Sequence, residues 1–121
     1  MLEKRIESYK KHLQMIEEEL AKDEIINDTK KLINYINLEP NLSQLINSKS
    51  NITAEDVLHK NINTMILLTN LLNKVSDKLD NSEITDVETY INLLSADTHL
   101  AVRIDRLQSM IENAKEQQEN I

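Results

Sequence analysis

Asp56 and His59 have the spacing that comes closest to a metal-binding pair in this chain, because three residues along a helix bring two side chains to one face. Helical di-iron proteins use such a carboxylate–x–x–His pair twice and add two further glutamates, whereas here the pair occurs once. His12 and His99 each stand alone, and Asp97 lies two residues from His99, a spacing that turns two helical side chains apart. We therefore predict no metal site and no bound cofactor.

Composition also argues against catalysis. The 121-residue chain has neither cysteine nor glycine, which excludes thiolate chemistry, cysteine zinc sites and the glycine-rich loops that bind phosphates and dinucleotides. No nucleophile, base and orienting group can be assembled from the spacing of its serines, threonines and tyrosines. A helical protein without Phe or Trp has few ways to form a concave substrate pocket. We expect a protein that is not an enzyme.

The charge balance bears on the class of partner. A net charge of −7 and an isoelectric point near 4.9 oppose overall binding to nucleic acid or to anionic membranes. Lys4, Arg5, Lys10 and Lys11 form the best local basic patch, but residues 1–22 hold five basic and five acidic side chains. The patch therefore fits an ordinary solvated helix face, and a nucleic-acid-associated accessory factor remains an alternative.

Helices must position the charged and metal-ligating residues named above. The lack of glycine and the single proline favour an all-α fold, and we predict one domain over residues 1–121. Thr53 and Thr85 each precede acidic residues in the pattern of a helix N-cap, with Asp56 and Glu88 three residues later. Two helices are expected over 53–79 and 85–118, joined as an antiparallel coiled-coil hairpin, with a polar tail over 115–121.

The first 52 residues complete the predicted bundle of three long helices and one short connecting helix. Residues 1–38 carry helical apolar spacing, read here as one helix with a bend near Lys22 and Asp23, with a pair of separate helices as the alternative. Pro40 is expected to end this segment, because the residue before a proline disfavours the helical conformation. Residues 41–52 then form the connector, with a short helical turn.

Apolar side chains cover more of the predicted third helix than one seam requires. A helix that is apolar nearly all round is surrounded by protein, and three helices have difficulty in surrounding it. We therefore predict a homodimer, with self-association through Met65, Ile66, Leu68, Leu72, Leu100, Ile104, Leu107 and Ile111. The last helix carries a separate stripe in its first half, marked by Val87, Ile91 and Leu94.

Acidic residues concentrate around the predicted hairpin turn. Residues 77–105 contain seven acids and two bases, and such a surface suits a partner protein with a basic surface. The predicted partner-binding acidic face comprises Asp80, Glu83, Asp86 and Glu88.

Two polar residues interrupt the apolar seams of the hairpin. Asp97 lies between Leu93 and Leu100, and Asn61 has the comparable position in the preceding helix. One hypothesis is that Asp97 makes an inter-helical or inter-subunit contact, for example with Asn61, that sets the register. The other is that a small rotation leaves Asp97 at the bundle edge.

Together these features predict a non-catalytic protein-binding module, acting as an adaptor, an assembly factor or an inhibitor. A small immunity-type protein that neutralises a toxin is an alternative within the same class. No apolar run is long enough to cross a bilayer, and the charged N-terminus lacks a secretory signal, so we expect a cytoplasmic protein without membrane contact. The abundance of Ile, Asn and Lys is typical of low-GC bacteria and their phages.

Overall fold

The structure is a computed structural model in which residues 2–119 are described. It contains four long helices, α1 (Leu2–Leu20), α2 (Thr29–Lys49), α3 (Ala54–Asn81) and α4 (Val87–Glu119), and one 3-10 helix, η1 (Asp23–Asn27). No strand occurs over this range, so the predicted all-α helical bundle is confirmed. Four long helices stand where three were predicted, because the first segment forms α1 and α2 separately, and the expected short connecting helix is part of α2. Across the described residues, no helix has the length and apolarity needed to cross a membrane.

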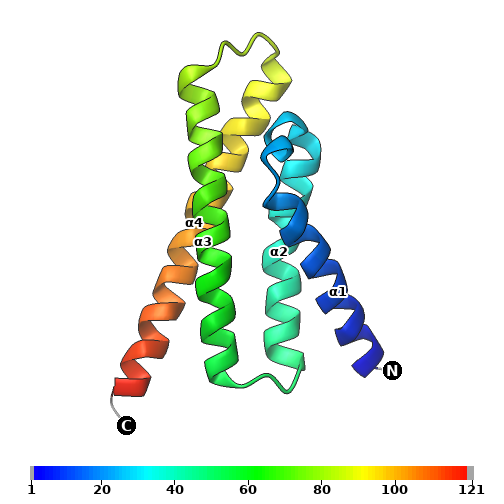
Figure 1. The fold of residues 1–121 in the computed structure, drawn as a ribbon, viewed down its shortest axis with the longest axis vertical. Coiled ribbons are helices and arrows are strands. Elements are labelled where there is room, and N and C mark those ends of the chain that lie inside the picture. The colour runs from blue at the N-terminus through cyan, green and yellow to red at the C-terminus, as the bar shows by residue number, and fades with distance from the viewer. Residues whose placement is uncertain (1, 120–121) are drawn as a thin grey trace.

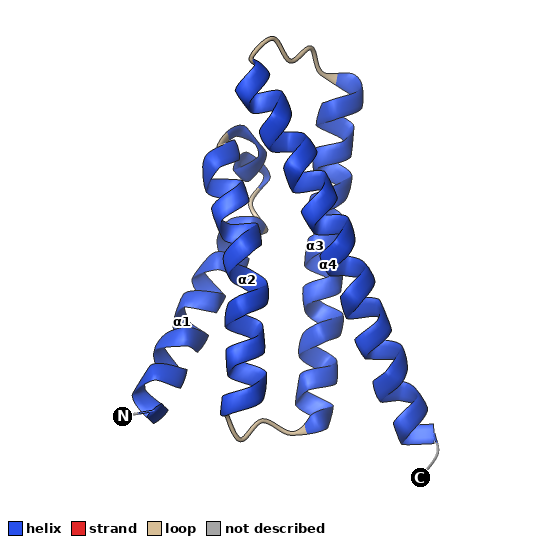
Figure 2. Cartoon of the chain, turned by 180° about the vertical axis from the view of Figure 1, so that it is seen from behind, coloured by secondary structure: helices blue, strands red, loops and turns tan. Residues whose placement is uncertain are grey.

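The bundle is built from two antiparallel hairpins. Helix α1 packs against α2, and α3 packs against α4. The hairpins meet mainly where α2 contacts α4, while α1 touches α3 only lightly. In Figures 1 and 2, α1 and α4 diverge from the two central helices toward one end, which holds both ends of the drawn chain.

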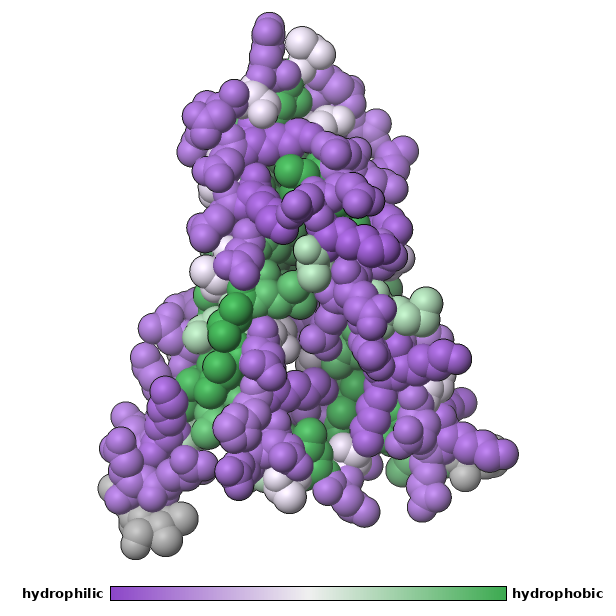
Figure 3. Space-filling view, viewed as in Figure 1, coloured by the Kyte–Doolittle hydropathy of each residue, from purple (hydrophilic) through white to green (hydrophobic). Residues whose placement is uncertain are grey.

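The lightly packed side of the bundle is hollowed. A groove of about 590 Å³ runs between α1 and α3, where Leu13, Ile46 and Leu67 line it together with Glu17 and Lys60. Figure 3 shows apolar atoms recessed between polar ridges in the lower half of the molecule. Leu32, Leu68 and Val75 are among the side chains that are almost completely buried in the core.

The first segment forms two helices. The prediction of one bent helix over residues 1–38 is therefore wrong, and the alternative of two separate helices is the one observed. Helix α1 ends at Leu20, and α2 begins at Thr29 with Asp28 as its N-cap, whose side chain accepts a hydrogen bond from the Lys31 N–H at 3.2 Å. The reversal buries Leu20 and Ile25 against the rest of the core. Burial of these apolar groups, which a continuous helix would carry away from the bundle, explains the break.

Pro40 does not end a helix, contrary to the prediction. Helix α2 continues through it to Lys49, although proline removes one helical hydrogen bond and crowds the preceding turn. The reason is tertiary: Glu39, Ser43 and Ile46 all face inward after or beside the proline and are buried. Their contacts retain the helical conformation, and the predicted connector 41–52 reduces to a short loop after Ser50.

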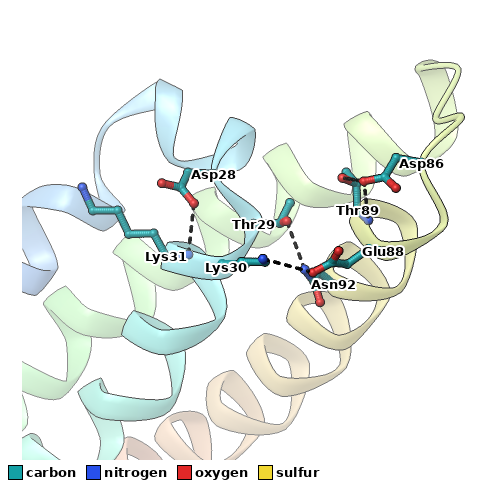
Figure 4. Close-up of polar contacts among 8 residues, drawn as sticks. All are labelled: Asp28, Thr29, Lys30, Lys31, Asp86, Glu88, Thr89 and Asn92. Carbon is teal, nitrogen blue, oxygen red and sulfur yellow. Dashed lines mark hydrogen bonds and ion pairs between the residues drawn. The ribbon is translucent and has the colours of Figure 1, made fainter.

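The two predicted N-caps have different outcomes. Thr53 caps α3 as expected, since its hydroxyl accepts a hydrogen bond from the Asp56 N–H at 3.1 Å. At α4 the cap is Asp86 instead of Thr85. The Asp86 carbonyl accepts the first helical bond, from the Tyr90 N–H at 3.0 Å, and its carboxylate accepts bonds from the Thr89 N–H and hydroxyl at 3.3 and 2.6 Å (Figure 4). Thr85 with Glu88 was the more regular capping box of the two, yet the acid one residue after Thr85 supplies the acceptor at α4.

Candidate protein-binding site

The first half of α4 presents a second apolar face to solvent. Val87, Ile91, Leu94 and Val102 are 69, 56, 43 and 47% exposed, and their spacing places them on one side of the helix. The opposite side carries the buried Leu93, Leu100 and Leu107 against the core. The row spans the 16 residues from Val87 to Val102, or about 22 Å at 1.5 Å per residue, with the exposed Thr98 between Leu94 and Val102. Helix α4 is therefore apolar on two sides but covered on one, which is the pattern of a helix that has a further partner.

Acidic groups lie at the N-terminal end of this face. The predicted acidic residues Asp80, Glu83, Asp86 and Glu88 are all exposed, and they cluster at the α3–α4 turn, the upper end in Figure 1. Two of them have structural roles as well: Asp86 caps α4, and Glu88 lies 3.4 Å from the Lys30 ammonium (Figure 4). The hydrogen bonds from Thr89 lower the pKa of Asp86. It is therefore a fixed negative charge beside the apolar face.

The two bases of the acidic stretch are occupied within the chain. The Lys78 ammonium donates to the Ile26 carbonyl at 3.4 Å and to Asn27 Oδ1 at 3.0 Å, and Arg103 binds Glu39. They therefore cannot neutralise the surface acids around the exposed face of α4. This face combines an apolar centre with an acidic flank.

The residues predicted for self-association lie mostly in the core of the chain and not on the outer face of α4. Leu68, Leu100, Leu107 and Ile111 are buried in the core of the single chain, Met65, Leu72 and Ile104 are partly buried, and Ile66 alone is well exposed. The apolar excess of α3 is therefore largely used within the chain, where α3 packs mainly against α4.

The two polar seam residues do not meet. Asp97 Oδ1 accepts a hydrogen bond from Ser76 Oγ on α3 at 3.2 Å and is partly buried. Asn61 is buried near the opposite end of α3, where it lines a cavity with Ser43 and Arg103. Within one chain the Asn61–Asp97 contact does not form, because the antiparallel register places Ser76 opposite Asp97. The polar contact between the helices is real, but its partner differs.

Sequence reasoning missed a buried ion pair between the two hairpins. Glu39 on α2 is 1% exposed, and both of its carboxylate oxygens accept hydrogen bonds from the Arg103 guanidinium on α4 at 2.8 Å. The Ser43 hydroxyl donates a third bond to it at 2.7 Å. Glu39 and Ser43 continue the seam that begins at Leu32 and Ile36, with alternating spacings of four and three. This continuation of the seam could have identified Glu39 and Ser43 as inward-facing residues. It was missed because Pro40 was expected to end the helix.

Two further charges lie beside this pair in the α1–α3 groove. Burial raises the pKa of Glu17, and the nearby Glu39 carboxylate adds to this effect. Burial lowers the pKa of Lys60, while Glu17 and Glu39 oppose the change. Each of the four long helices thus contributes one charged group to this region.

The histidines do not form a metal centre in the described part of the chain. His59 Nε2 lies 3.7 Å from Glu55 Oε1 on the exposed side of α3, and His99 Nδ1 lies 2.7 Å from the Ser95 carbonyl oxygen. Between residues 2 and 119, no three His, Cys, Asp or Glu side chains gather as a metal site would require.

Comparisons of the chain with protein-family models, with curated proteins and with solved structures find no match.

Proposed function

We propose that this chain is a non-catalytic protein-binding module whose binding surface is the outer apolar face of α4, formed by Val87, Ile91, Leu94 and Val102. The observation that carries the proposal is that this face is exposed and lies opposite the face that α4 turns to the core. Exposed apolar side chains that are contiguous along one helix mark interaction surfaces, whereas scattered ones are ordinary.

The chemistry of the flank defines the partner further. Asp86 and Glu88 border the start of the apolar face, and the bases Lys78 and Arg103 are engaged elsewhere in the chain. A complementary partner therefore carries an apolar strip with basic residues at its edge. An adaptor, an assembly factor and an inhibitor would all use such a surface in the same way.

The nucleic-acid alternative has less support. Lys4, Arg5, Lys10 and Lys11 are exposed on α1, but Lys10 lies 3.6 Å from the Glu7 carboxylate on the same helix. Residues 1–22 hold as many acidic as basic side chains, and the whole chain has a net charge of −7. Phosphate binding would require a larger basic surface.

The test compares two matched surface substitutions. Ile91→Glu places a charge on the outer face of α4, and Ile66→Glu places one on α3 at a residue of nearly equal exposure, 56 against 54%. Tagged full-length proteins are used to capture partners from the native cell under cross-linking, after circular dichroism has shown that both variants fold. We expect Ile91→Glu to lose at least nine-tenths of the captured protein, an effect of about 1.4 kcal/mol or more, while Ile66→Glu retains it. Equal capture by both variants would contradict the proposal.

A further inference from the structure

The cavity that Asn61 lines lies between three helices. It holds about 440 Å³ among the C-terminal half of α2, the first half of α3 and the middle of α4, toward the end of the bundle at which α4 diverges (Figure 2). Pro40 and Met110 provide apolar walls, and the other lining residues are serines, amides and arginines. Apolar walls with a few convergent polar groups, in a volume of about 300–1,000 Å³, are typical of small-molecule sites.

The Asn47 carboxamide is left unpaired by the chain. Its Oδ1 atom is buried, and no group of the described residues donates a hydrogen bond to it. Buried polar atoms are almost always hydrogen-bonded, and Asn47 is one of the residues that line the cavity. An occupant that satisfies this oxygen must carry an O–H or N–H group.

The Asn61 carboxamide is a second polar group available to an occupant. Its residue is only 5% exposed and lines the same cavity. The hydrogen bonds of this region join Ser43 and Arg103 to Glu39, and none of them includes the Asn61 amide. This amide can donate and accept at once, so it can bind a polar group of either kind.

The charge of the cavity is set by arginine. Arg103 and Arg106 line it, and no Asp or Glu does so among the described residues. Glu39 neutralises Arg103 from behind, but it accepts only from Nε and one terminal nitrogen, so the other terminal nitrogen remains available. Arg106 forms no ion pair with a described residue. The C-terminus of α2 adds a partial negative charge, which Lys49 in its last turn opposes. The positive charge of Arg106 is therefore left in excess.

We propose that this cavity binds a small organic carboxylate that carries a hydroxyl group next to its acid group. The carboxylate accepts hydrogen bonds from Arg106 and from the available nitrogen of Arg103, because the planar guanidinium matches the geometry of a carboxylate. The hydroxyl donates to Asn47 Oδ1, and the apolar body of the ligand lies along Pro40 and Met110. An ammonium group in place of the hydroxyl would lie beside the arginines without an acid to pair with, so a hydroxy acid fits better than an amino acid.

This site is separate from the proposed protein-binding surface. Arg103 binds Glu39 and therefore lies on the side of α4 that faces α2, whereas the outer face of α4 is exposed to solvent. The inference does not rest on the proposed function, and Ile91→Glu should leave ligand binding unchanged.

The experiment uses four probes that differ by one property each. Mandelate combines a carboxylate, an adjacent hydroxyl and an apolar ring. Phenylacetate lacks only the hydroxyl, mandelamide lacks only the charge, and inorganic phosphate tests for a plain anion site. Each probe is titrated at neutral pH into the isotope-labelled full-length protein, and binding is followed through the NMR signals of the backbone and of the Asn47 and Asn61 side-chain amides.

We expect mandelate to shift both side-chain amide signals saturably, with a dissociation constant of about 1 mM or lower. Phenylacetate should bind about threefold to tenfold more weakly, because it lacks the donor to Asn47, and mandelamide at least about tenfold more weakly, because it lacks the charge. Phosphate should bind more weakly than mandelate.

Two variants assign these effects to their residues, after circular dichroism has shown that they fold. Arg106→Gln should raise the dissociation constant of mandelate at least about tenfold, whereas Arg5→Gln, at an exposed arginine of α1, is the matched control and should leave it unchanged. Asn47→Leu removes the unpaired oxygen, so mandelate and phenylacetate should bind this variant equally.

Several results would overturn the inference. They are the lack of a saturable shift with mandelate up to about 50 mM, equal binding of mandelate and phenylacetate by wild type, and unchanged mandelate binding in Arg106→Gln. Phosphate bound more tightly than mandelate would reject the hydroxy acid in favour of a plain anion site. Should Asn47→Leu fail to fold, the comparison of mandelate with phenylacetate on wild type still tests the need for a donor.

Discussion

Replacing Arg103 by methionine should destabilise the protein more than any surface substitution, because it leaves the Glu39 carboxylate buried without its cation. Glu39 is 1% exposed, and Arg103 supplies two of its three hydrogen bonds, both at 2.8 Å. Removing one partner of a buried ion pair costs about 3–5 kcal/mol. Because the Arg103 side chain itself is 14% exposed, water can reach part of the site, and we expect a loss near the lower end, about 3 kcal/mol.

That loss can be converted into a melting temperature. Unfolding entropy is about 2.1 cal/mol/K per residue, so a chain of 121 residues loses about 4 °C for each kcal/mol, or about 12 °C for Arg103→Met. Urea denaturation followed by circular dichroism measures the free energy of unfolding directly, and calorimetry measures the temperature. Ser43→Ala is the milder companion, expected to cost about 1 kcal/mol, since the carboxylate then retains both bonds to the guanidinium.

The double substitution Glu39→Met with Arg103→Met distinguishes the stability cost of burying an unpaired charge from the stability cost of lost packing. Methionines of similar length remove both charges, and such replacements are often neutral or stabilising. We expect the double variant to recover to within about 1 kcal/mol of wild type. A single variant within about 1 kcal/mol of wild type, or a double variant as unstable as the single one, would refute the assignment of Glu39–Arg103 as a buried pair between the hairpins.

Three further predictions concern the core, the start of α4 and the α1–α3 groove. Leu107→Ala should cost about 2–5 kcal/mol by leaving a cavity, whereas Ile66→Ala on the exposed side of α3 should cost under about 0.5 kcal/mol in the same urea titration. Asp86→Ala should lower the melting temperature at pH 7, while Thr85→Ala leaves it unchanged; since the pKa of Asp86 is lowered in the folded state, its contribution is present above its unfolded pKa and lost as the pH falls through its folded pKa. Equal effects of the two substitutions would contradict the position of the cap. Glu17→Gln should stabilise the protein at pH 7, because burial raises the pKa of Glu17 in the folded state and disfavours its charge. The folded state then binds the proton more tightly than the unfolded one, so the gain should shrink as the pH falls through that raised pKa; a gain independent of pH would count against this explanation.

Much of the architecture was predictable because its signals are local. Apolar residues three and four apart define helix faces, and Thr53 followed by Asp56 placed the start of α3 correctly. The polar turn between the last two helices was found for the same reason. The acidic face was also predictable, since charged side chains that lack apolar neighbours remain on the surface.

The errors occurred where tertiary contacts overrode a local rule. Pro40 should end a helix by its own stereochemistry, yet burial of Glu39 and Ile46 carries α2 through it. Similarly, Asn61 and Asp97 occupy comparable seam positions, but the register of an antiparallel pair depends on the whole interface, which places Ser76 beside Asp97.

The candidate site was also predictable only in part. Val87, Ile91 and Leu94 were recognisable as a stripe from their spacing, and the acids near them were recognisable from composition. Periodicity cannot tell which of two apolar faces of α4 is turned to the core, because both satisfy the same spacing.

The sequence by itself therefore determined the helical class, the approximate start of the last two helices and the acidic character of their turn, since each follows from neighbouring residues. The tertiary structure alone decided that residues 1–49 form a hairpin, that Leu68 and Leu107 belong to the core while Ile91 remains exposed, and that Glu39 meets Arg103. Burial is a property of what packs against a residue, and those neighbours come from distant parts of the chain.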